Sequence, residues 1–311
     1  MQKGETVFVA GHRGLVGSAI VRRLEAEGLG PVLTRGRAEL DLTDRTAVDR
    51  FFAEQKPAYV FLAAAKVGGI LANDTYPADF IRDNLLIQTH VIDAAHRSGA
   101  KKLLFLGSSC IYPKLAQQPI KEDYLLTGAL EPTNDAYAVA KIAGIQMCKA
   151  YNKQFGMRAI SLMPTNLYGP NDNFDLQKSH VLPALMRKFH EAKVSGKPDV
   201  VVWGSGSPRR EFLHVDDLAD ACVHLMRTYE SPELVNVGVG DDVTIRELAE
   251  TIRDVVGFFG DLSWDTSKPD GTPRKLLDVS RLHGLGWRAK IGLRQGIAQT
   301  YAWYLANVAN E

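Results

Sequence analysis

The sequence predicts an α/β protein with a Rossmann-type, doubly wound parallel sheet followed by a smaller C-terminal α/β domain. Short apolar runs alternate with longer amphipathic runs over the first half of the chain, a pattern typical of strand–helix–strand crossovers. After Pro170 the elements become shorter and are separated by segments rich in Gly, Pro and Ser. The 311 residues are 45% hydrophobic, so the chain can bury a large core.

The expected elements follow each other in a regular order. Strands are expected at TVFVAG, PVLT, YVFLAAA, KLLFLGSS and RAISLMP, and helices from about Gly14 to Gly28 and over 44–55, 77–98 and 136–155. Parallel strands need helical crossovers, so these helices should cover both faces of the sheet. We expect residues 1–167 to form a nucleotide-binding domain to which residues 208–230 return, and residues 168–311 to form the second domain.

Charge and hydropathy exclude several classes of partner. Lys and Arg number 37 against 36 Asp and Glu, and neither sign forms a long run, so we expect no nucleic acid or anionic membrane surface as partner. No apolar stretch approaches the roughly 18 residues of a membrane span, and no signal peptide is visible, which predicts a cytoplasmic protein. The three cysteines are too scattered for a disulfide framework, and no Cys/His spacing indicates a metal site.

The first strand runs into a glycine loop and then a helix. Glycines at such a turn let backbone N–H groups approach a pyrophosphate at the helix N-terminus, which favours dinucleotide binding over a plain tight turn. The residues expected to bind the cofactor here are Gly11, His12, Arg13, Gly14, Leu15, Val16 and Gly17.

The residues after the second strand favour NADP(H) over NAD. Arg35-Gly36-Arg37 stands where an Asp or Glu would bind an unmodified ribose, and guanidinium groups hold a 2′-phosphate with paired donors. Arg13, inside the glycine loop, is a further cation that favours NADP(H). Asp41-Leu42, farther along the chain, could border the adenine. The alternative is that the arginines of this segment are merely solvated.

Tyr137 and Lys141 lie four residues apart at the start of an expected helix and therefore share one face. An ammonium beside a phenol favours the phenolate, so we expect Lys141 to lower the pKa of Tyr137 and suit it to donate a proton to a carbonyl oxygen that receives hydride. Ser108, at the end of an earlier expected strand, completes the set in chain order.

These motifs together resemble the extended short-chain dehydrogenase/reductases, a family that acts mostly on nucleotide sugars. Asn84, PTNLYGP at 164–170 and REFLHVDD at 210–217 extend the resemblance over essentially the whole chain. It implies that Ser108, Tyr137 and Lys141 polarise the carbonyl, transfer its proton and bind the nicotinamide ribose. It also implies further cofactor contacts from Leu106, Gly107, Pro164, Thr165, Asn166, Leu167 and His180. A homodimer built on the helices around 77–98 and 136–155 is implied as well.

Reduction of a carbonyl group gives no role to Cys110. Residues i and i+2 of an extended strand end face the same side, so Cys110 should point with Ser108, and a thiol can act as acid or base at a carbon next to a carbonyl. Inverting that carbon needs a second group, and His180 offers an imidazole that titrates near neutral pH. For a lone histidine, burial in the core or plain surface exposure is the usual alternative.

Four segments make the resemblance more specific, namely GSSCIYPK, EPTNDAYAVAKIAG, SHVLPAL and SKPDGTPRKLLDVSRLH. It implies an enzyme that epimerises C3 and C5 of the GDP-sugar GDP-4-keto-6-deoxy-D-mannose, using Cys110 and His180, and then reduces C4 with NADPH. The alternatives are another nucleotide-sugar epimerase or reductase of the family, or a non-catalytic NADP-sensing regulator.

The nucleotide end of the substrate needs donors for a diphosphate. Lys188, Arg210 and Arg274 supply them, Arg210 most clearly by its motif position. Trp203 could pack against the base or sugar, or lie in the core. Asp278 is a candidate substrate contact by resemblance, with a helix N-terminal carboxylate as the alternative. Cys148 and Cys222 lie on apolar helical stripes and are expected to be buried packing residues.

Overall fold

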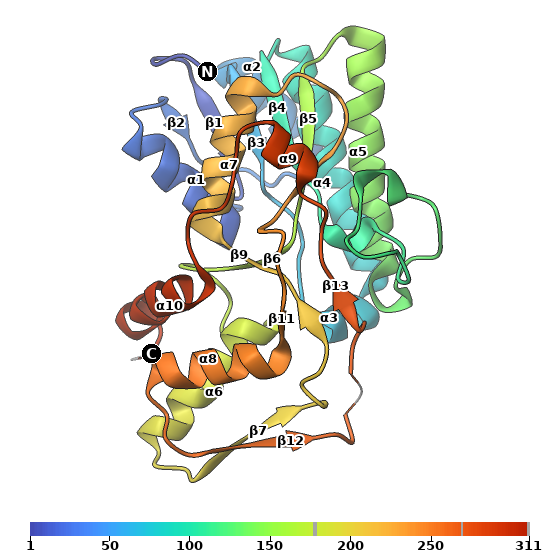
Figure 1. Ribbon diagram of the computed structural model, residues 1–311. Helices are drawn as coiled ribbons and strands as arrows, with labels where there is room; N and C mark the ends of the chain where they lie inside the picture. Colours follow the sequence, from blue (N-terminus) through green and yellow to red (C-terminus); the bar gives the residue numbers. More distant parts are fainter. Residues whose placement is uncertain (177–178, 269, 310–311) are drawn as a thin grey trace.

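The computed structural model describes residues 1–176, 179–268 and 270–309, so parts of the segments NDNFDLQKSH and SKPDGTPRK lie outside the described residues. Its central feature is a six-stranded parallel sheet in the order β10-β5-β4-β3-β1-β2 (Figure 1). The strands are β1 (Val7–Ala10), β2 (Val32–Leu33), β3 (Tyr59–Leu62), β4 (Lys102–Leu106), β5 (Ala159–Pro164) and β10 (Val235–Val237). The predicted parallel sheet is confirmed.

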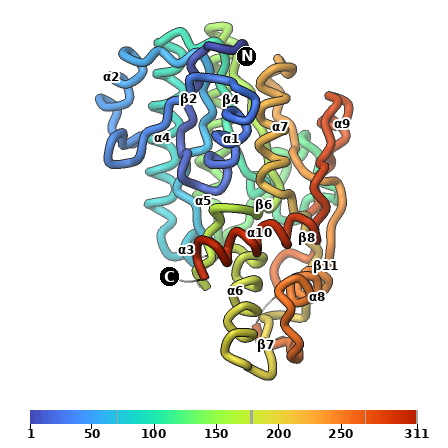
Figure 2. The backbone as a smooth tube through the Cα atoms, turned by 90° about the vertical axis from the view of Figure 1, so that its left-hand side faces the viewer, coloured from blue at the N-terminus to red at the C-terminus, as the bar shows by residue number. Residues whose placement is uncertain are grey.

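Helices cover both faces of this sheet. One pair consists of α1 (Leu15–Ala26) and α7 (Val215–Thr228), which pack together; on the other face α4 (Pro77–Arg97) packs against α2 (Arg45–Gln55) and α5 (Asp135–Phe155). Figure 2 places α2 and α4 on one side of the strands and α7 on the other. Short helices α3 (Ile70–Thr75), η1 (Ser109–Ile111), η2 (Glu122–Tyr124) and η3 (Pro132–Asn134) connect these elements.

Most of the remaining elements form the lower half of Figure 1, whereas α9 (Ser280–Gly284) lies in the upper half, where it contacts β10. The others are α6 (Val181–Val194), α8 (Ile245–Val256), α10 (Leu293–Asn307), the parallel pair β7 (Asp199–Trp203) and β12 (Asp261–Asp265), the pair β6 (Asn166–Tyr168) and β9 (Phe212–His214), and a small sheet of β11 (Val243–Thr244), β8 (Arg209–Arg210) and β13 (Arg274–Lys275).

The buried apolar side chains gather in two clusters. The first surrounds the six-stranded sheet, and the second joins α6, α8 and α10 through residues such as Leu185, Phe189 and Ile252. Residues 213–229 pack in the first cluster, and so do 234–237 and 277–287, which the sequence analysis had assigned to the second region. These late segments return because β10 extends the sheet beside β5, where Val235 and Val237 are buried.

The glycine loop follows β1 at the carboxyl end of the parallel strands, the end at which open α/β sheets bind ligands. The chain leaves β1 toward β2 on one side and returns to β3 on the other, so β1 and β3 form a topological switch point. Gly11 follows β1 with φ +87°, and a Cβ there would lie 2.8 Å from Cα of Ala64, just after β3. Only glycine allows the two strand ends to approach this closely.

Glu211, between β8 and β9, connects several of these segments. Its carboxylate is fully buried and accepts backbone N–H groups of Val239 at 2.6 Å, Gly240 at 2.8 Å and Leu277 at 3.0 Å. Its main-chain carbonyl accepts Asn166 Nδ2 at 2.8 Å. Burial raises the pKa of Glu211, and the backbone donors oppose that effect.

We expect Glu211→Gln to destabilise the fold by about 2–3 kcal/mol, because one carboxylate oxygen is replaced by an NH₂ group that cannot accept a buried N–H. Urea unfolding measures the loss. Glu250→Gln on the exposed face of α8 is the control and should stay within about 0.5 kcal/mol of the wild type. Equal stability of the two variants would contradict the role given to Glu211.

Candidate active site

The glycine loop and the first turn of α1 fit a dinucleotide diphosphate. Gly14 is the N-cap of α1, no side chain caps this terminus, and the first turn holds no acidic residue. The free backbone N–H groups and the positive end of the helix dipole are therefore available to an anion. His12 beside this loop has its pKa lowered by burial and by Arg13.

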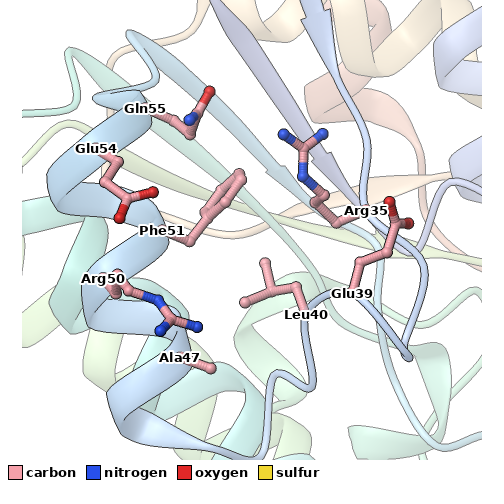
Figure 3. A pocket seen from close by; sticks show the side chains of 8 residues that line it. All are labelled: Arg35, Glu39, Leu40, Ala47, Arg50, Phe51, Glu54 and Gln55. Carbon is pink, nitrogen blue, oxygen red and sulfur yellow. The ribbon is translucent and has the colours of Figure 1, made fainter.

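The segment expected to hold a ribose 2′-phosphate lies next to a shallow pocket between α2 and residues 35–40 (Figure 3). Arg35 faces the ring of Phe51 at 5.7 Å, and Arg50 and Glu54 line the opposite wall. Two cations, Arg35 and Arg50, and two carboxylates, Glu39 and Glu54, line this pocket.

Arg13 and Arg37 are the cations nearest to the end of this segment. The guanidinium of Arg13 lies against Gly36, where a Cβ would come within 3.2 Å of it. Arg37 is 80% exposed and 3.6 Å from Asp41, whose carboxylate also accepts the backbone N–H of Thr43. Hydrogen bonds from Thr43 hold the pKa of Asp41 low. Leu42 is fixed through its carbonyl, 3.1 Å from His90 Nδ1.

The reductase residues meet where β4 ends against α5. Helix α5 approaches the sheet closely because Gly144 lies against the ring of Phe105, where a Cβ would clash. Lys141 is buried and donates from Nζ to the carbonyl oxygen of Leu106 at 2.8 Å. Tyr137 packs edge to face on Phe80, with ring centroids 6.3 Å apart.

The expected effect of Lys141 on Tyr137 is wrong for this structure. Burial, followed by the negative charge that Cys110 can carry, raises the pKa of Tyr137. The Lys141 ammonium is 5.8 Å from the centre of the Tyr137 ring and is bound to Leu106 instead. Burial lowers the pKa of Lys141 to about 8. Tyr137 is therefore a protonated phenol here, the form that donates a proton.

Cys110 lies with these residues, although not for the reason expected from the sequence. The backbone turns into the 3-10 helix η1 at Ser109, so the i, i+2 rule of an extended strand does not apply. Instead Ser108 caps η1, and its Oγ accepts Cys110 N at 3.4 Å. Burial raises the pKa of the Cys110 thiol, and Lys275, Ser108 and Lys141 oppose this in that order.

His180 is the N-cap of α6, a helix whose Leu182 and Leu185 pack in the second apolar cluster. His180 is exposed as a residue, which excludes the core alternative. No cluster of His, Cys, Asp and Glu that could hold a metal occurs among the described residues. Desolvation of the imidazole by the surrounding protein, followed by the charge of Lys275, lowers its pKa. Lys275 was not singled out in the sequence, and it is the cation that acts on both Cys110 and His180.

The residues proposed for the nucleotide end fall into two groups. Trp203 is 66% exposed, which excludes the core alternative, and Lys188 and Lys268 lie over its ring at 5.2 and 5.6 Å. Among the described residues Arg210 donates to the carbonyl of Arg209, and desolvation lowers its pKa. These side chains present cations and an aromatic face, both of which suit a nucleoside diphosphate.

Arg274 and Asp278 have structural partners instead. Arg274 Nε lies 2.5 Å from Asp242, which also holds Arg209 at 2.6 Å, so Arg274 is engaged in a fork between β8 and β13. The Asp278 carboxylate accepts Ser280 N at 2.9 Å, the hydrogen bond of a helix N-terminal carboxylate. Ser280 thereby lowers the pKa of Asp278. A substrate contact of Asp278 stays a prediction.

The junction residues and the other cysteines also have defined places. Thr165 N donates to Val237 O at 3.0 Å, and Asn84 spans Lys66 N and O, both at 3.0 Å, so they fix the ends of β5 and β3. Gly107, Pro164 and Leu167 lie at the same carboxyl edge of the strands. Cys148 and Cys222 are buried, which confirms their expected packing role. None of the described helices is long and apolar enough to cross a membrane.

The site and the fold define the class of protein: residues 7–238 match the model of the NAD dependent epimerase/dehydratase family, and the chain belongs to this family. The predicted resemblance is thereby confirmed. The chain is 66% identical over 308 residues to GDP-L-fucose synthase 1 of Arabidopsis thaliana, covering 99% of this chain and 95% of the relative.

Solved structures of family members agree with this. A GDP-L-fucose synthetase from Naegleria fowleri bound to NADP has a TM-score of 0.92 and 31% identity, covering 99% of this chain and 96% of its own. A GDP-6-OMe-4-keto-L-xylo-heptose reductase from C. jejuni has a TM-score of 0.94 and 40% identity, covering 98% and 99%.

Lys141→Met should stabilise the protein at pH 7 by about 2–3 kcal/mol. The folded pKa of about 8 is below the ordinary 10.5, so the unfolded chain binds more protons between these values and wild-type stability rises through that window. The advantage of the variant should vanish above roughly pH 10.5. Urea unfolding at pH 7 and pH 10.5 tests this; a variant less stable at pH 7 would refute it.

Arg13→Gln should raise the KM for NADPH by about tenfold or more and the KM for NADH by less than about twofold, because only NADPH loses a charged hydrogen bond. Steady-state kinetics with both cofactors measures the two values. Arg50→Gln, in the neighbouring pocket of Figure 3, is the matched control and should leave both unchanged. Equal changes in the KM values for both cofactors would show that Arg13 does not bind the 2′-phosphate.

Proposed function

We propose that the protein converts GDP-4-keto-6-deoxy-D-mannose to GDP-L-fucose, by epimerising C3 and C5 and then reducing C4 with NADPH. The observation that carries this proposal is the grouping of Cys110 with Ser108, Tyr137 and Lys141 at the end of β4. A reductase needs the last three residues alone. The relatives named as GDP-L-fucose synthases support the choice of sugar and base.

In the epimerisation, the C4 ketone acidifies the hydrogens on C3 and C5. Cys110 and His180 are proposed to lie on opposite faces of the sugar ring, so that one removes the proton and the other returns one to the opposite face. The electron pair of the broken C–H bond moves to O4 as an enolate and returns when the new C–H bond forms. Ser108 and Tyr137 are placed to hydrogen-bond O4 while it carries this charge.

In the reduction, the same two hydroxyl groups act on the same oxygen. Bound NADPH supplies a hydride to C4. Tyr137, kept protonated by its burial, gives its proton to O4 as the alcohol forms. Lys141 donates to Leu106 O, and its ammonium would bind the nicotinamide ribose of the cofactor. One site thus serves both steps, since O4 is the group polarised in each.

Substrate binding at the far end is assigned to Lys188, Arg210 and Trp203. Lys188 and Arg210 lie without a salt bridge in the described parts of the chain, and burial lowers the pKa of each, so a diphosphate would restore a favourable partner for both. The exposed ring of Trp203 offers a stacking face for the base or sugar.

The proposal includes a homodimer and a cytoplasmic location. Helices α4 and α5 pack side by side, and α5 keeps Val139 and Phe155 45% and 47% exposed. Such side chains suit packing against a second copy of the same helices.

We expect Cys110→Ser to lose the epimerisation while keeping the ability to reduce. Wild type and variant are incubated with GDP-4-keto-6-deoxy-D-mannose and NADPH, and the product sugar is identified by NMR. Wild type should yield GDP-L-fucose; the variant should stall or yield an unepimerised 6-deoxyhexose. Cys222→Ser, at a buried position remote from these residues in the chain, is the control. If wild type itself makes only the unepimerised alcohol, the protein is a reductase like the C. jejuni relative.

A further inference from the structure

Cys110 lies in a turn that is too short to hold its own shape. The turn is the 3-10 helix η1 (Ser109–Ile111), and a helix of one turn gains little from its own hydrogen bonds. Ser108 caps its first end, where its Oγ accepts Cys110 N, and Tyr112 is the residue that ends it. The position of the Cys110 thiol therefore depends on what holds these two flanking residues.

The side chain of Tyr112 binds the second end of the turn to the sheet. Tyr112 is 3% exposed, and its Oη donates to Asn236 Oδ1 at 2.5 Å. Burial, followed by the charge of Glu122, raises the pKa of Tyr112, so the phenol keeps its proton and remains a donor. The proposed reaction gives no role to this hydroxyl.

The acceptor, Asn236, lies on β10 and is fully buried, so its amide must find partners inside the protein. Its Nδ2 donates to the carbonyl oxygen of Ile120 at 2.9 Å and to that of Asp278 at 3.1 Å. These two hydrogen bonds fix the orientation of the amide, with Oδ1 toward Tyr112. The hydroxyl of Tyr112 thus binds a group that the sheet and two further segments hold in place.

The serine and lysine of the reduction step are anchored by other contacts. Lys141 donates to a main-chain carbonyl at the end of β4, 2.8 Å away. The N–H of Gly107, the residue before Ser108, donates to a carbonyl of β5 at 2.9 Å. Neither contact includes the hydroxyl of Tyr112. Without that hydroxyl, Cys110 should shift while Ser108 and Lys141 keep their places.

We propose that Tyr112 is a positioning residue for the epimerisation: its hydrogen bond to Asn236 fixes the turn that carries Cys110, and thereby the distance of the thiol from the sugar carbon. The inference rests on the proposed function for its effect on turnover but not for its first test. In each inversion one of Cys110 and His180 takes the proton as the C–H bond breaks, the electron pair moves to O4, and the other gives a proton to the opposite face. A shift of about 1 Å can slow such a transfer by about 100-fold.

The first test is the rate at which iodoacetamide alkylates Cys110 at pH 7, measured for each cysteine by mass spectrometry of the labelled peptides. Cys110 is partly exposed, whereas Cys148 and Cys222 are buried. In Tyr112→Phe the freed turn should open more often, so alkylation of Cys110 should be about fivefold faster or more, with the other two cysteines still protected. An unchanged or slower rate overturns the inference. Faster labelling of all three cysteines would indicate global loosening and would overturn it too.

Tyr229→Phe is the matched control. Tyr229 is another buried tyrosine of the first cluster, and its hydroxyl donates to Glu233 O at 2.9 Å. It lies at the opposite end of β4 from the turn, where Lys102 binds its main-chain carbonyl. The variant therefore loses a hydrogen bond of the same kind, and its alkylation rate should equal that of wild type. Equal acceleration in both variants would indicate a general loss of stability and contradict the role given to Tyr112.

The second test follows deuterium entry at C3 and C5 of the keto sugar in D₂O without NADPH. In Tyr112→Phe the maximal exchange rate should fall by about tenfold or more, with the KM for the sugar and the Kd for NADPH within about twofold of wild type. Normal exchange, or an equal loss of NADPH affinity, overturns the inference. Absence of exchange in wild type would instead refute the proposed function, and the alkylation rates would still decide whether Tyr112 positions the turn.

Discussion

The buried carboxylate of Glu211 is the interaction on which the arrangement of the site depends most. It joins three segments that are distant in sequence: the turn after β10, the segment after β13 at Leu277, and, through its own carbonyl, the start of β6 at Asn166. A buried carboxylate is costly unless backbone donors satisfy it. Moving any of those backbone donors would leave the buried carboxylate unsatisfied, so the hydrogen bonds fix the donors in place. They also fix the backbone of Glu211 and of its neighbour Arg210.

The same balance between burial and charge shapes the chemistry. At the end of β4, burial raises the pKa of the phenol and the thiol and lowers the pKa of the lysines, so every group is biased toward its neutral form. In such a site the side chains favour their neutral forms until a bound substrate supplies dipoles and anions that stabilise the charged forms. The two lysines differ in that Lys141 donates to the carbonyl of Leu106, whereas Lys275 forms no salt bridge within the described parts of the chain.

Much of the fold could be predicted because strand and helix periodicities are local properties. The expected helices at 77–98 and 136–155 match α4 and α5 closely, and the glycine loop stands at the expected strand-to-helix turn. What could not be predicted depends on distant contacts. The return of 277–287 to the first cluster follows from packing beside β10, and no local pattern in LLDVSRLHGLGW indicates it.

The candidate site shows the same limit. Cys110 was placed with Ser108 by a rule for extended strands, but η1 begins one residue earlier and Ser108 caps it. Arg274 and Lys275 are neighbours in sequence with opposite fates, one paired with Asp242 and the other left facing the thiol. Charge and motif alone could not separate them, because strand alternation on β13 and the position of β8 decide which side each faces.

The division of the apolar core into two clusters has a consequence for the distance between Cys110 and His180. Ile111, next to Cys110, is anchored in the first cluster, whereas His180 precedes a helix anchored in the second by Leu182 and Leu185. Their separation is therefore set by the docking of one cluster on the other and not by either alone. A substitution between the two clusters would therefore change the distance from Cys110 to His180 without altering either residue.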